Sequence, residues 1–264
     1  MLVRRDGIVQ ADAAHPRRPL ASPARCRVVV LAKEPEPGRV KTRLCPPLEP
    51  STAAECHEAF VVDTLSRVRH ALPDAETVLA VSPAGDRARR LREIALALGW
   101  QTVDQGGGDL GCRMNDIVRK GVREGRWVLL LGADTPDLPE RYVSDAFAAL
   151  QSASVVLGPA SDGGYYLVGC RDRVPPIFGP GMEWGTPVVW EQTLSRLREY
   201  DSRAGPAVLP PWFDVDDWKG LVALAKRVQR RCEHEREQER QNDEEPPVAT
   251  IDLLRRLRNA GFSL

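Results

Sequence analysis

The hydrophobic positions of this chain change period several times, and each change marks an expected element. Residues 28–31 and 127–131 are uninterrupted apolar runs, which are typical of parallel strands buried on both faces of a sheet. Residues 52–72 instead carry apolar side chains at helical spacing on one face, with Thr52 and Glu55 as a capping box. The pattern predicts that a strand and then a helix open the fold.

The same alternation continues along the chain. Further strands are expected at residues 77–82, 100–103, 154–157, 165–169 and 207–209, and further helices at residues 86–98, 114–125, 137–150, 186–198, 218–231 and 251–257. Strands that alternate with helices predict an α/β fold, a doubly wound and mostly parallel sheet with helices on both faces. Ligands of such sheets bind at the carboxyl ends of the strands.

Both ends of the chain differ in composition from the middle. Residues 1–24 are rich in Ala, Pro and Arg without periodicity, so we expect a disordered leader. Residues 25–231 hold the expected strands and are predicted to form one domain. Residues 232–264 begin with a strongly polar stretch and are predicted to be a charged tail that ends in a short helix.

Charge and cysteine usage narrow the classes of function. Lys+Arg and Asp+Glu are both 37 in this 264-residue chain, so no net charge favours nucleic acid or an acidic membrane as partner. The six cysteines form no C-x-x-C pair, which predicts reduced thiols and a cytoplasmic protein. No apolar run approaches the ~20 residues of a membrane span.

The loop after the first expected strand concentrates positive charge. Pro35, Pro37 and Gly38 restrict its backbone, and the loop lies at the carboxyl end of a strand. These features favour phosphate binding, although an ordinary basic surface loop is the alternative. Its charged side chains are Lys33, Arg39, Lys41 and Arg43, against Glu34 and Glu36.

Aspartates at three other loops are candidate metal ligands. Asp134 follows the apolar run at residues 127–131, Asp162 precedes a strand, and Asp214 and Asp216 precede the helix expected at residue 218. Mg²⁺ needs few protein carboxylates, so Asp134 with Asp214 or Asp216 would suffice. The structural alternatives are a turn residue for Asp134 and a helix N-cap for Asp216, whereas Asp214 has no comparable structural reason.

Two glycine-containing segments are candidate ligand contacts. Gly163 and Gly164 would let the backbone approach a ligand, and the Tyr165 and Tyr166 that follow should face opposite sides of the sheet. One tyrosine is therefore expected in a pocket and the other in the core. Residues 105–114 form a second such segment, in which Asp109 and Arg113 are polar contacts unless the loop is merely mobile.

Five ordered motifs resemble one bacterial family. AKEPEPGRVKTRL, GDLGCRM, LLGADTPDL, VVLGPASDGGYYLVG and DVDDW occur in the order and spacing of glycosyltransferase-like proteins from arsenosugar-biosynthesis and selenodomain-linked gene contexts. That family is similar to GT-A nucleotide-diphospho-sugar transferases, so the resemblance implies a GT-A-like fold. It implies nucleotide binding by Lys33, Gly38, Lys41, Arg43, Gln105, Gly108 and Asp109, and metal binding by Asp134. From the residues themselves, Arg113 is added to the nucleotide contacts. Substrate binding is expected of Gly163, Gly164, Tyr165 and Trp184, although the tryptophan-serine-threonine of the family is Trp184-Gly185-Thr186 here.

The resemblance also implies an activity. The expected reaction is metal-dependent transfer of a sugar from a nucleotide sugar to a small-molecule acceptor, with Mg²⁺ or Mn²⁺ as cofactor. No histidine lies in any motif, so the candidate general base is a carboxylate, Asp162. A nucleotidyltransferase acting on a nucleoside triphosphate is the first alternative, although the basic loop lacks the glycine pair that opens such loops. A nucleotide-binding regulator without activity is the second.

Overall fold

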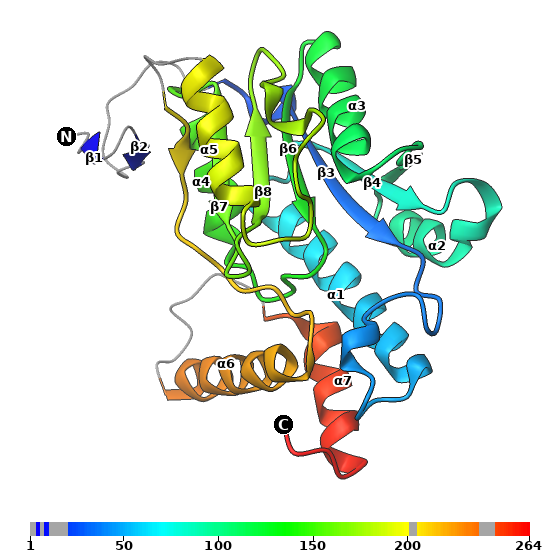
Figure 1. The fold of residues 1–264 in the computed structure, drawn as a ribbon. Coiled ribbons are helices and arrows are strands. Elements are labelled where there is room, and N and C mark those ends of the chain that lie inside the picture. The colour runs from blue at the N-terminus through cyan, green and yellow to red at the C-terminus, as the bar shows by residue number, and fades with distance from the viewer. Residues whose placement is uncertain (1–3, 6–7, 11–20, 201–204, 238–245) are drawn as a thin grey trace.

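The sheet at the centre of the molecule confirms the expected doubly wound α/β class. The computed structural model describes all residues except 1–3, 6–7, 11–20, 201–204 and 238–245, and its strands pair in the order β1-β2-β9-β7-β8-β6-β3-β4-β5 (Figure 1). The strands are β1 (Arg4–Arg5), β2 (Ile8–Gln10), β3 (Cys26–Lys33), β4 (Glu76–Ser82), β5 (Gln101–Asp104), β6 (Trp127–Gly132), β7 (Val155–Pro159), β8 (Tyr165–Cys170) and β9 (Ala207–Val208).

The described residues also form seven helices and four short 3-10 turns, and the last two helices follow the final strand. The helices are α1 (Pro50–Ala71), α2 (Arg89–Ala97), α3 (Leu110–Arg123), α4 (Glu140–Ala149), α5 (Val189–Tyr200), α6 (Trp218–Glu237) and α7 (Val248–Asn259), and the turns are Pro23–Arg25, Thr42–Leu44, Gly85–Ala88 and Pro176–Phe178. None of these helices has both the length and the apolar composition needed to cross a membrane.

The antiparallel strand β8 determines which loops lie at the same edge of the sheet. β8 runs antiparallel to both of its neighbours, β6 and β7, whereas β3 pairs in parallel with β4 and β6. The prediction that residues 127–131 form a strand with only parallel neighbours is therefore wrong for the pairing with β8. Because β8 is reversed, its amino end lies at the same edge as the carboxyl ends of β3 and β6, which brings Asp162 to the edge that also holds Asp134.

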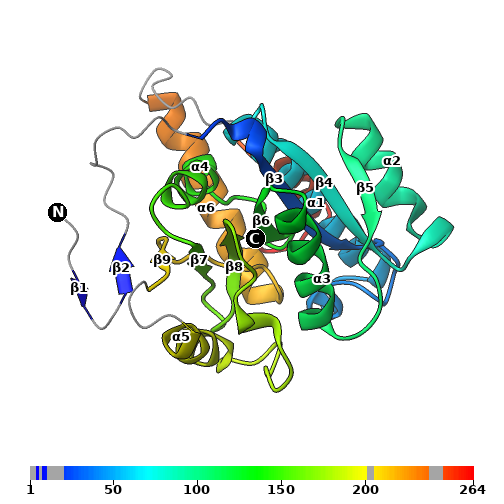
Figure 2. The same cartoon turned by 90° about the horizontal axis from the view of Figure 1, so that it is seen from above.

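Helices cover both faces of the sheet, as the unbroken apolar strands predicted. Val30 of β3 and Leu131 of β6 pack with α1, α2 and α4 on one face, and Val29 and Leu130 pack with α3 and α5 on the other. Figure 2 shows α4 and α1 on one side of the strands and α3 and α5 on the other. Alternate side chains of each strand therefore enter separate cores.

The carboxyl-terminal segment packs into a third core. Leu253, Leu254 and Leu257 of α7 are buried with α6 and the first turns of α1. Asp63 of α1 accepts hydrogen bonds from the backbone N–H groups of Ala249 (3.0 Å) and Thr250 (2.7 Å) at the start of α7. α7 thus packs into the fold like the other helices, and the expected boundary at residue 231 falls inside α6.

Two local predictions are corrected by the structure. α1 begins at Pro50 with Glu49 as N-cap and no side-chain cap, so Thr52 and Glu55 form no capping box. Proline stabilises a first helical position because its fixed φ is already helical. α3 begins at Leu110, inside the glycine-rich segment. Within the expected leader, β1 and β2 are strands at the edge of the sheet, and most of its other residues lie outside the described part.

Candidate active site

A cavity of about 490 Å³ lies at the sheet edge where these loops meet. Its wall combines the loop after β3, residues 132–135 after β6, the segment before β8 and residues 184–186. The predicted site residues that line it are Lys33, Lys41, Arg43, Gln105, Arg113, Asp134, Asp162, Gly164, Tyr165, Trp184, Asp214 and Asp216. The predicted residues that do not line it are Gly38, Gly108, Asp109 and Gly163.

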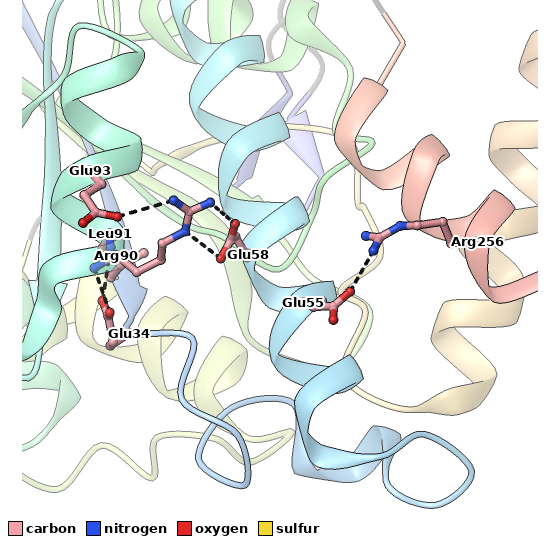
Figure 3. A network of polar contacts seen from close by, with 7 residues as sticks. All are labelled: Glu34, Glu55, Glu58, Arg90, Leu91, Glu93 and Arg256. Carbon is pink, nitrogen blue, oxygen red and sulfur yellow. Dashed lines mark hydrogen bonds and ion pairs between the residues drawn. The ribbon is translucent and has the colours of Figure 1, made fainter. Parts of the chain in front are cut away.

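The loop after β3 is held by a polar network at its start. The carboxylate of Glu34 accepts hydrogen bonds from the backbone N–H groups of Arg90 (2.8 Å) and Leu91 (3.1 Å) in the first turn of α2. The guanidinium group of Arg90 in turn pairs with Glu58 of α1 and with Glu93 (Figure 3). A carboxylate at a helix amino end satisfies free N–H groups and the helix dipole together. The network joins the loop to both helices.

Three polar contacts hold the side chain of Lys41 in the cavity wall. Its ammonium group lies 2.6 Å from Oδ1 of Asp134 and 3.0 Å from Oδ1 of Asp216, and it donates to the carbonyl oxygen of Val215 at 2.7 Å. The side chain is 5% exposed, and φ at this residue is +48°, in the left-handed region. An ammonium group has three protons, so these partners leave no donor for the phosphate contact predicted for Lys41.

The carboxylates around Lys41 have opposite pKa shifts. Burial alone would raise the pKa of Asp134, but Lys41 and His57 outweigh it and hold that pKa below its ordinary value. Burial raises the pKa of Asp214 to about 8, and the carboxylates of Asp162, Asp134 and Asp216 add to the shift. At neutral pH, Asp214 therefore keeps its proton while Asp134 is ionised beside Lys41.

The N-cap of α6 is Asp217, so Asp216 is not needed to cap this helix. Oδ1 of Asp217 accepts a hydrogen bond from the backbone N–H of Gly220 at 2.7 Å, which is the geometry of an N-cap. Asp216 was the expected candidate for that role. Its carboxylate instead contacts Lys41 and lines the cavity.

His57 of α1 lines the cavity although no sequence motif indicated it. Its Nε2 lies 2.9 Å from the carbonyl oxygen of Lys33, and its Nδ1 lies 3.9 Å from Oδ1 of Asp134. Desolvation lowers the pKa of His57, and the opposing effect of Asp134 does not compensate. The only hint in the sequence was that His57 lies on the helix directly after the basic loop.

The glycine-rich segment contributes fewer side chains than predicted. Asp109 is the N-cap of α3, its Oδ1 accepting from the backbone N–H of Cys112 at 2.8 Å. Gln105 is buried, and its amide donates to the carbonyl oxygens of Ala32 and Ala80. The guanidinium group of Arg113 donates to the carbonyl oxygen of Gly108 at 3.0 Å. Gln105 and Arg113 thus reach the cavity, whereas Asp109 caps α3 and does not line the cavity.

Aromatic side chains form the apolar side of the cavity. The rings of Tyr165 and Trp184 meet edge to face with centroids 6.3 Å apart. Tyr166 faces the opposite core and donates its hydroxyl to the carbonyl oxygen of Pro210, as the strand alternation predicted. Gly111 permits the approach of Trp184, because a Cβ at Gly111 would lie 2.6 Å from Nε1 of the indole.

Gly163 has a backbone role beside this wall. Its φ is +92°, and a Cβ there would lie 2.4 Å from the carbonyl oxygen of Pro187. Its own carbonyl accepts from the backbone N–H of Trp190 at 2.9 Å. Gly163 therefore seats the start of α5 against the loop, which explains why glycine is needed at a position that does not line the cavity.

The cavity thus unites oxygen donors with basic groups. No three side chains among His, Cys, Asp and Glu are grouped as a ready-made metal site in the part of the chain that the structure describes. The carboxylates of Asp134, Asp214 and Asp216 nevertheless face one cavity. Arg39 of the basic loop also lines the cavity and pairs with Glu36 at 3.0 Å.

Comparisons with known proteins place this fold among the GT-A-like and nucleotidyltransferase structures. A crystal structure from Desulfovibrio desulfuricans G20, described as a "putative nucleotide-diphospho-sugar transferase", is 30% identical over 89% of this chain and 96% of its own, with a TM-score of 0.73. The family described as "Uncharacterized protein conserved in bacteria (DUF2064)" matches residues 64–186. The chain belongs to this family.

More distant structures share the fold alone. A cytidylyltransferase from Leptospira borgpetersenii serovar Hardjo-bovis is 11% identical over 91% of this chain and 98% of its own, with a TM-score of 0.50. A nucleotidyl transferase from Methanothermobacter thermautotroptrophicus is 14% identical over 78% of this chain and 99% of its own, with the same TM-score. No curated protein matches the sequence.

Proposed function

We propose that this protein transfers a sugar from a nucleotide-diphospho-sugar to a small-molecule acceptor, with Mg²⁺ or Mn²⁺ as cofactor. One observation carries the proposal: a single cavity joins a basic loop to a cluster of aspartates. A diphosphate bound through a metal ion needs both, because carboxylates hold the cation and basic side chains neutralise the phosphates. Lys33, Arg39 and Arg43 are the exposed basic side chains on that loop.

The aspartates would hold the cation. Asp134, Asp214 and Asp216 supply the oxygen ligands that Mg²⁺ and Mn²⁺ prefer. When bound, the cation would neutralise charge that develops on the departing diphosphate. Lys41 would hold the carboxylates of Asp134 and Asp216 in place through its two ion pairs, and its charge keeps the pKa of Asp134 low.

Other residues of the cavity would orient the two substrates. Tyr165 and Trp184 offer an apolar wall for the face of a base or a sugar ring. Asp162, in the turn before β8, would accept the proton of the acceptor hydroxyl as its oxygen bonds to the anomeric carbon. The bond from that carbon to the diphosphate oxygen would break in the same step, and the nucleoside diphosphate would leave.

Similarity to a named relative supports this choice. The Desulfovibrio desulfuricans protein, 30% identical over most of the chain, carries the description of a nucleotide-diphospho-sugar transferase. A nucleotidyltransferase is the second candidate, because two proteins with that kind of name share the fold and a loop rich in Lys and Arg suits a triphosphate equally well. The two reactions break different bonds, so their products differ.

The test is incubation of the full chain with nucleotide sugars, and separately with nucleoside triphosphates, in the presence of Mg²⁺ or Mn²⁺. We expect release of a nucleoside diphosphate from a nucleotide sugar, measured by liquid chromatography and mass spectrometry. Release of pyrophosphate from a triphosphate would favour the nucleotidyltransferase instead. Release of neither product, with nucleotide bound, would support a regulator.

A variant pair connects the activity to the cavity. Asp134→Asn keeps the size of the side chain but removes the charge that would hold the cation, so turnover should fall by about a hundredfold or more. Asp172→Asn is the matched control, because Asp172 is exposed, follows the far end of β8 and pairs with Arg171. Equal turnover in both variants would remove Asp134 from the proposed metal site.

A further inference from the structure

The ring of His57 has a defined orientation and tautomer. His57 is 6% exposed, and its Nε2 lies 2.9 Å from the carbonyl oxygen of Lys33. A carbonyl oxygen can only accept a hydrogen bond, so Nε2 carries the proton. In the neutral ring, Nδ1 therefore presents a lone pair.

That lone pair meets a carboxylate. Nδ1 is buried without a hydrogen-bond partner, and the oxygen opposite it is Oδ1 of Asp134 at 3.9 Å. A hydrogen bond between the two atoms would need a separation of about 2.7–3.2 Å. Two electron-pair donors thus face each other in the cavity wall with no hydrogen bond between them. A cation bound between the two atoms would accept an electron pair from each.

The gap has the dimensions of a shared metal ion. Metal–nitrogen and metal–oxygen bonds to His and Asp are about 2.0–2.2 Å, so two ligands on opposite sides of one ion lie about 4 Å apart. The observed 3.9 Å lies close to that separation. A peptide oxygen on the far side of the ring, at Nε2, is also the usual partner of a metal-binding histidine.

Lys41 leaves enough negative charge for such an ion. Its ammonium group contacts the same Oδ1 of Asp134, but a carboxylate oxygen has a second lone pair. Asp162 and Asp216 line the same cavity as Asp134, so three carboxylates stand against one buried ammonium. A divalent ion beside His57 would reduce this imbalance.

We propose that Nδ1 of His57 is a ligand of the divalent cation, together with Asp134, and that the site consequently prefers a transition-metal ion such as Mn²⁺ or Co²⁺ over Mg²⁺. The inference rests on the metal requirement of the proposed function. Imidazole nitrogen is a good ligand for first-row transition metals, whereas Mg²⁺ selects oxygen and retains water.

The test is calorimetric titration of the metal-free full chain with Co²⁺ and with Mg²⁺. We expect wild-type protein to bind Co²⁺ at least about tenfold more tightly than Mg²⁺. His57→Gln keeps an N–H group for Lys33, and it should lose about tenfold or more in Co²⁺ affinity, since even loss of a group that only supports a ligand costs that much. His70→Gln is the matched control, because His70 lies on the same helix but does not line the cavity.

Unchanged Co²⁺ affinity in a folded His57→Gln variant would overturn the proposal, as would equal affinity of wild-type protein for Co²⁺ and Mg²⁺. If the variant does not fold, NMR of the Co²⁺-loaded wild type decides the question. The N–H at Nε2 of a bound His57 should give a paramagnetically shifted and exchange-protected resonance, because it donates to a buried carbonyl. Absence of that resonance would overturn the proposal. Metal binding through His57 without sugar transfer would refute the proposed function alone.

Discussion

The ammonium nitrogen of Lys41 lies 2.6 Å from Oδ1 of Asp134. The two residues follow β3 and β6, adjacent parallel strands whose carboxyl ends meet at one edge of the sheet. The same ammonium group reaches Asp216 and Val215 in the segment before α6. The buried ammonium group of Lys41 therefore connects three loops that are far apart in the sequence. Its contacts hold the cavity wall together and leave it little capacity to bind a ligand.

Replacement of Lys41 is expected to destabilise the protein. Lys41→Met leaves the carbonyl of Val215 and two carboxylates without their donor, at a cost of about 1–3 kcal/mol in the free energy of unfolding, limited because both carboxylates are partly exposed to water. Urea denaturation measures the change. Arg43→Met is the control: Arg43 is exposed in the same loop and should change stability by less than about 0.5 kcal/mol. Equal effects would show that Lys41 contributes no special stability.

Asp214 should make the metal-free protein less stable as the pH rises. Its pKa is about 8 in the folded protein and about 3.9 in an unfolded chain. The folded state therefore keeps a proton that the unfolded state releases, so the free energy of unfolding falls between about pH 4 and about pH 8. Asp214→Asn should remove this part of the pH dependence.

Melting temperatures at pH 5 and pH 8 in the presence of a chelator measure this effect. The wild-type melting temperature should fall more than that of Asp214→Asn over this interval. Asp172→Asn, at an exposed carboxylate remote from the cavity, should follow the wild type. Parallel curves for wild type and Asp214→Asn would show that Asp214 titrates normally.

Substitution by serine is expected to be tolerated at Asp217 but to lower activity at Asp216. Serine can replace Asp217 as the N-cap of α6, so Asp217→Ser should be nearly neutral while Asp217→Ala costs about 1 kcal/mol. Asp216→Ser should instead lower activity, since it removes a carboxylate from Lys41 and from the cavity. Thermal unfolding and turnover assays on the three variants separate the roles. Loss of activity only in Asp217→Ser would reverse the assignment.

Arg43 is the best remaining candidate for a phosphate contact on the basic loop. It lines the cavity and is exposed. A charge-assisted hydrogen bond is worth roughly 1.5–3 kcal/mol, so Arg43→Ala should weaken nucleotide diphosphate binding by about tenfold or more. Calorimetric titration measures the affinity. Arg89→Ala, at an exposed arginine of α2 that does not line the cavity, should bind as the wild type does; equal affinity in both variants would exclude Arg43.

Local pattern was sufficient for the fold class and for most elements. The apolar run of β6, the helical spacing of α1 and the alternation of Tyr165 and Tyr166 all depend on periods of two or 3.6 residues. These periods are properties of neighbouring residues, so a single sequence contains them. The ends of parallel strands then lie at one edge by topology, which is why the basic loop and Asp134 could be expected in one cavity.

The partner of each polar side chain depended on contacts between distant segments. Asp216 and Asp217 are neighbours with similar cap propensity, and only the approach of Lys41 from the other end of the chain distinguishes them. In the sequence, nothing distinguishes His57 from the other residues of α1. In the structure, the turn after β6 places Asp134 opposite its ring. The burial, hydrogen bonds and charge environment of these side chains depend on how distant segments pack at the sheet edge. Local sequence patterns do not encode that packing.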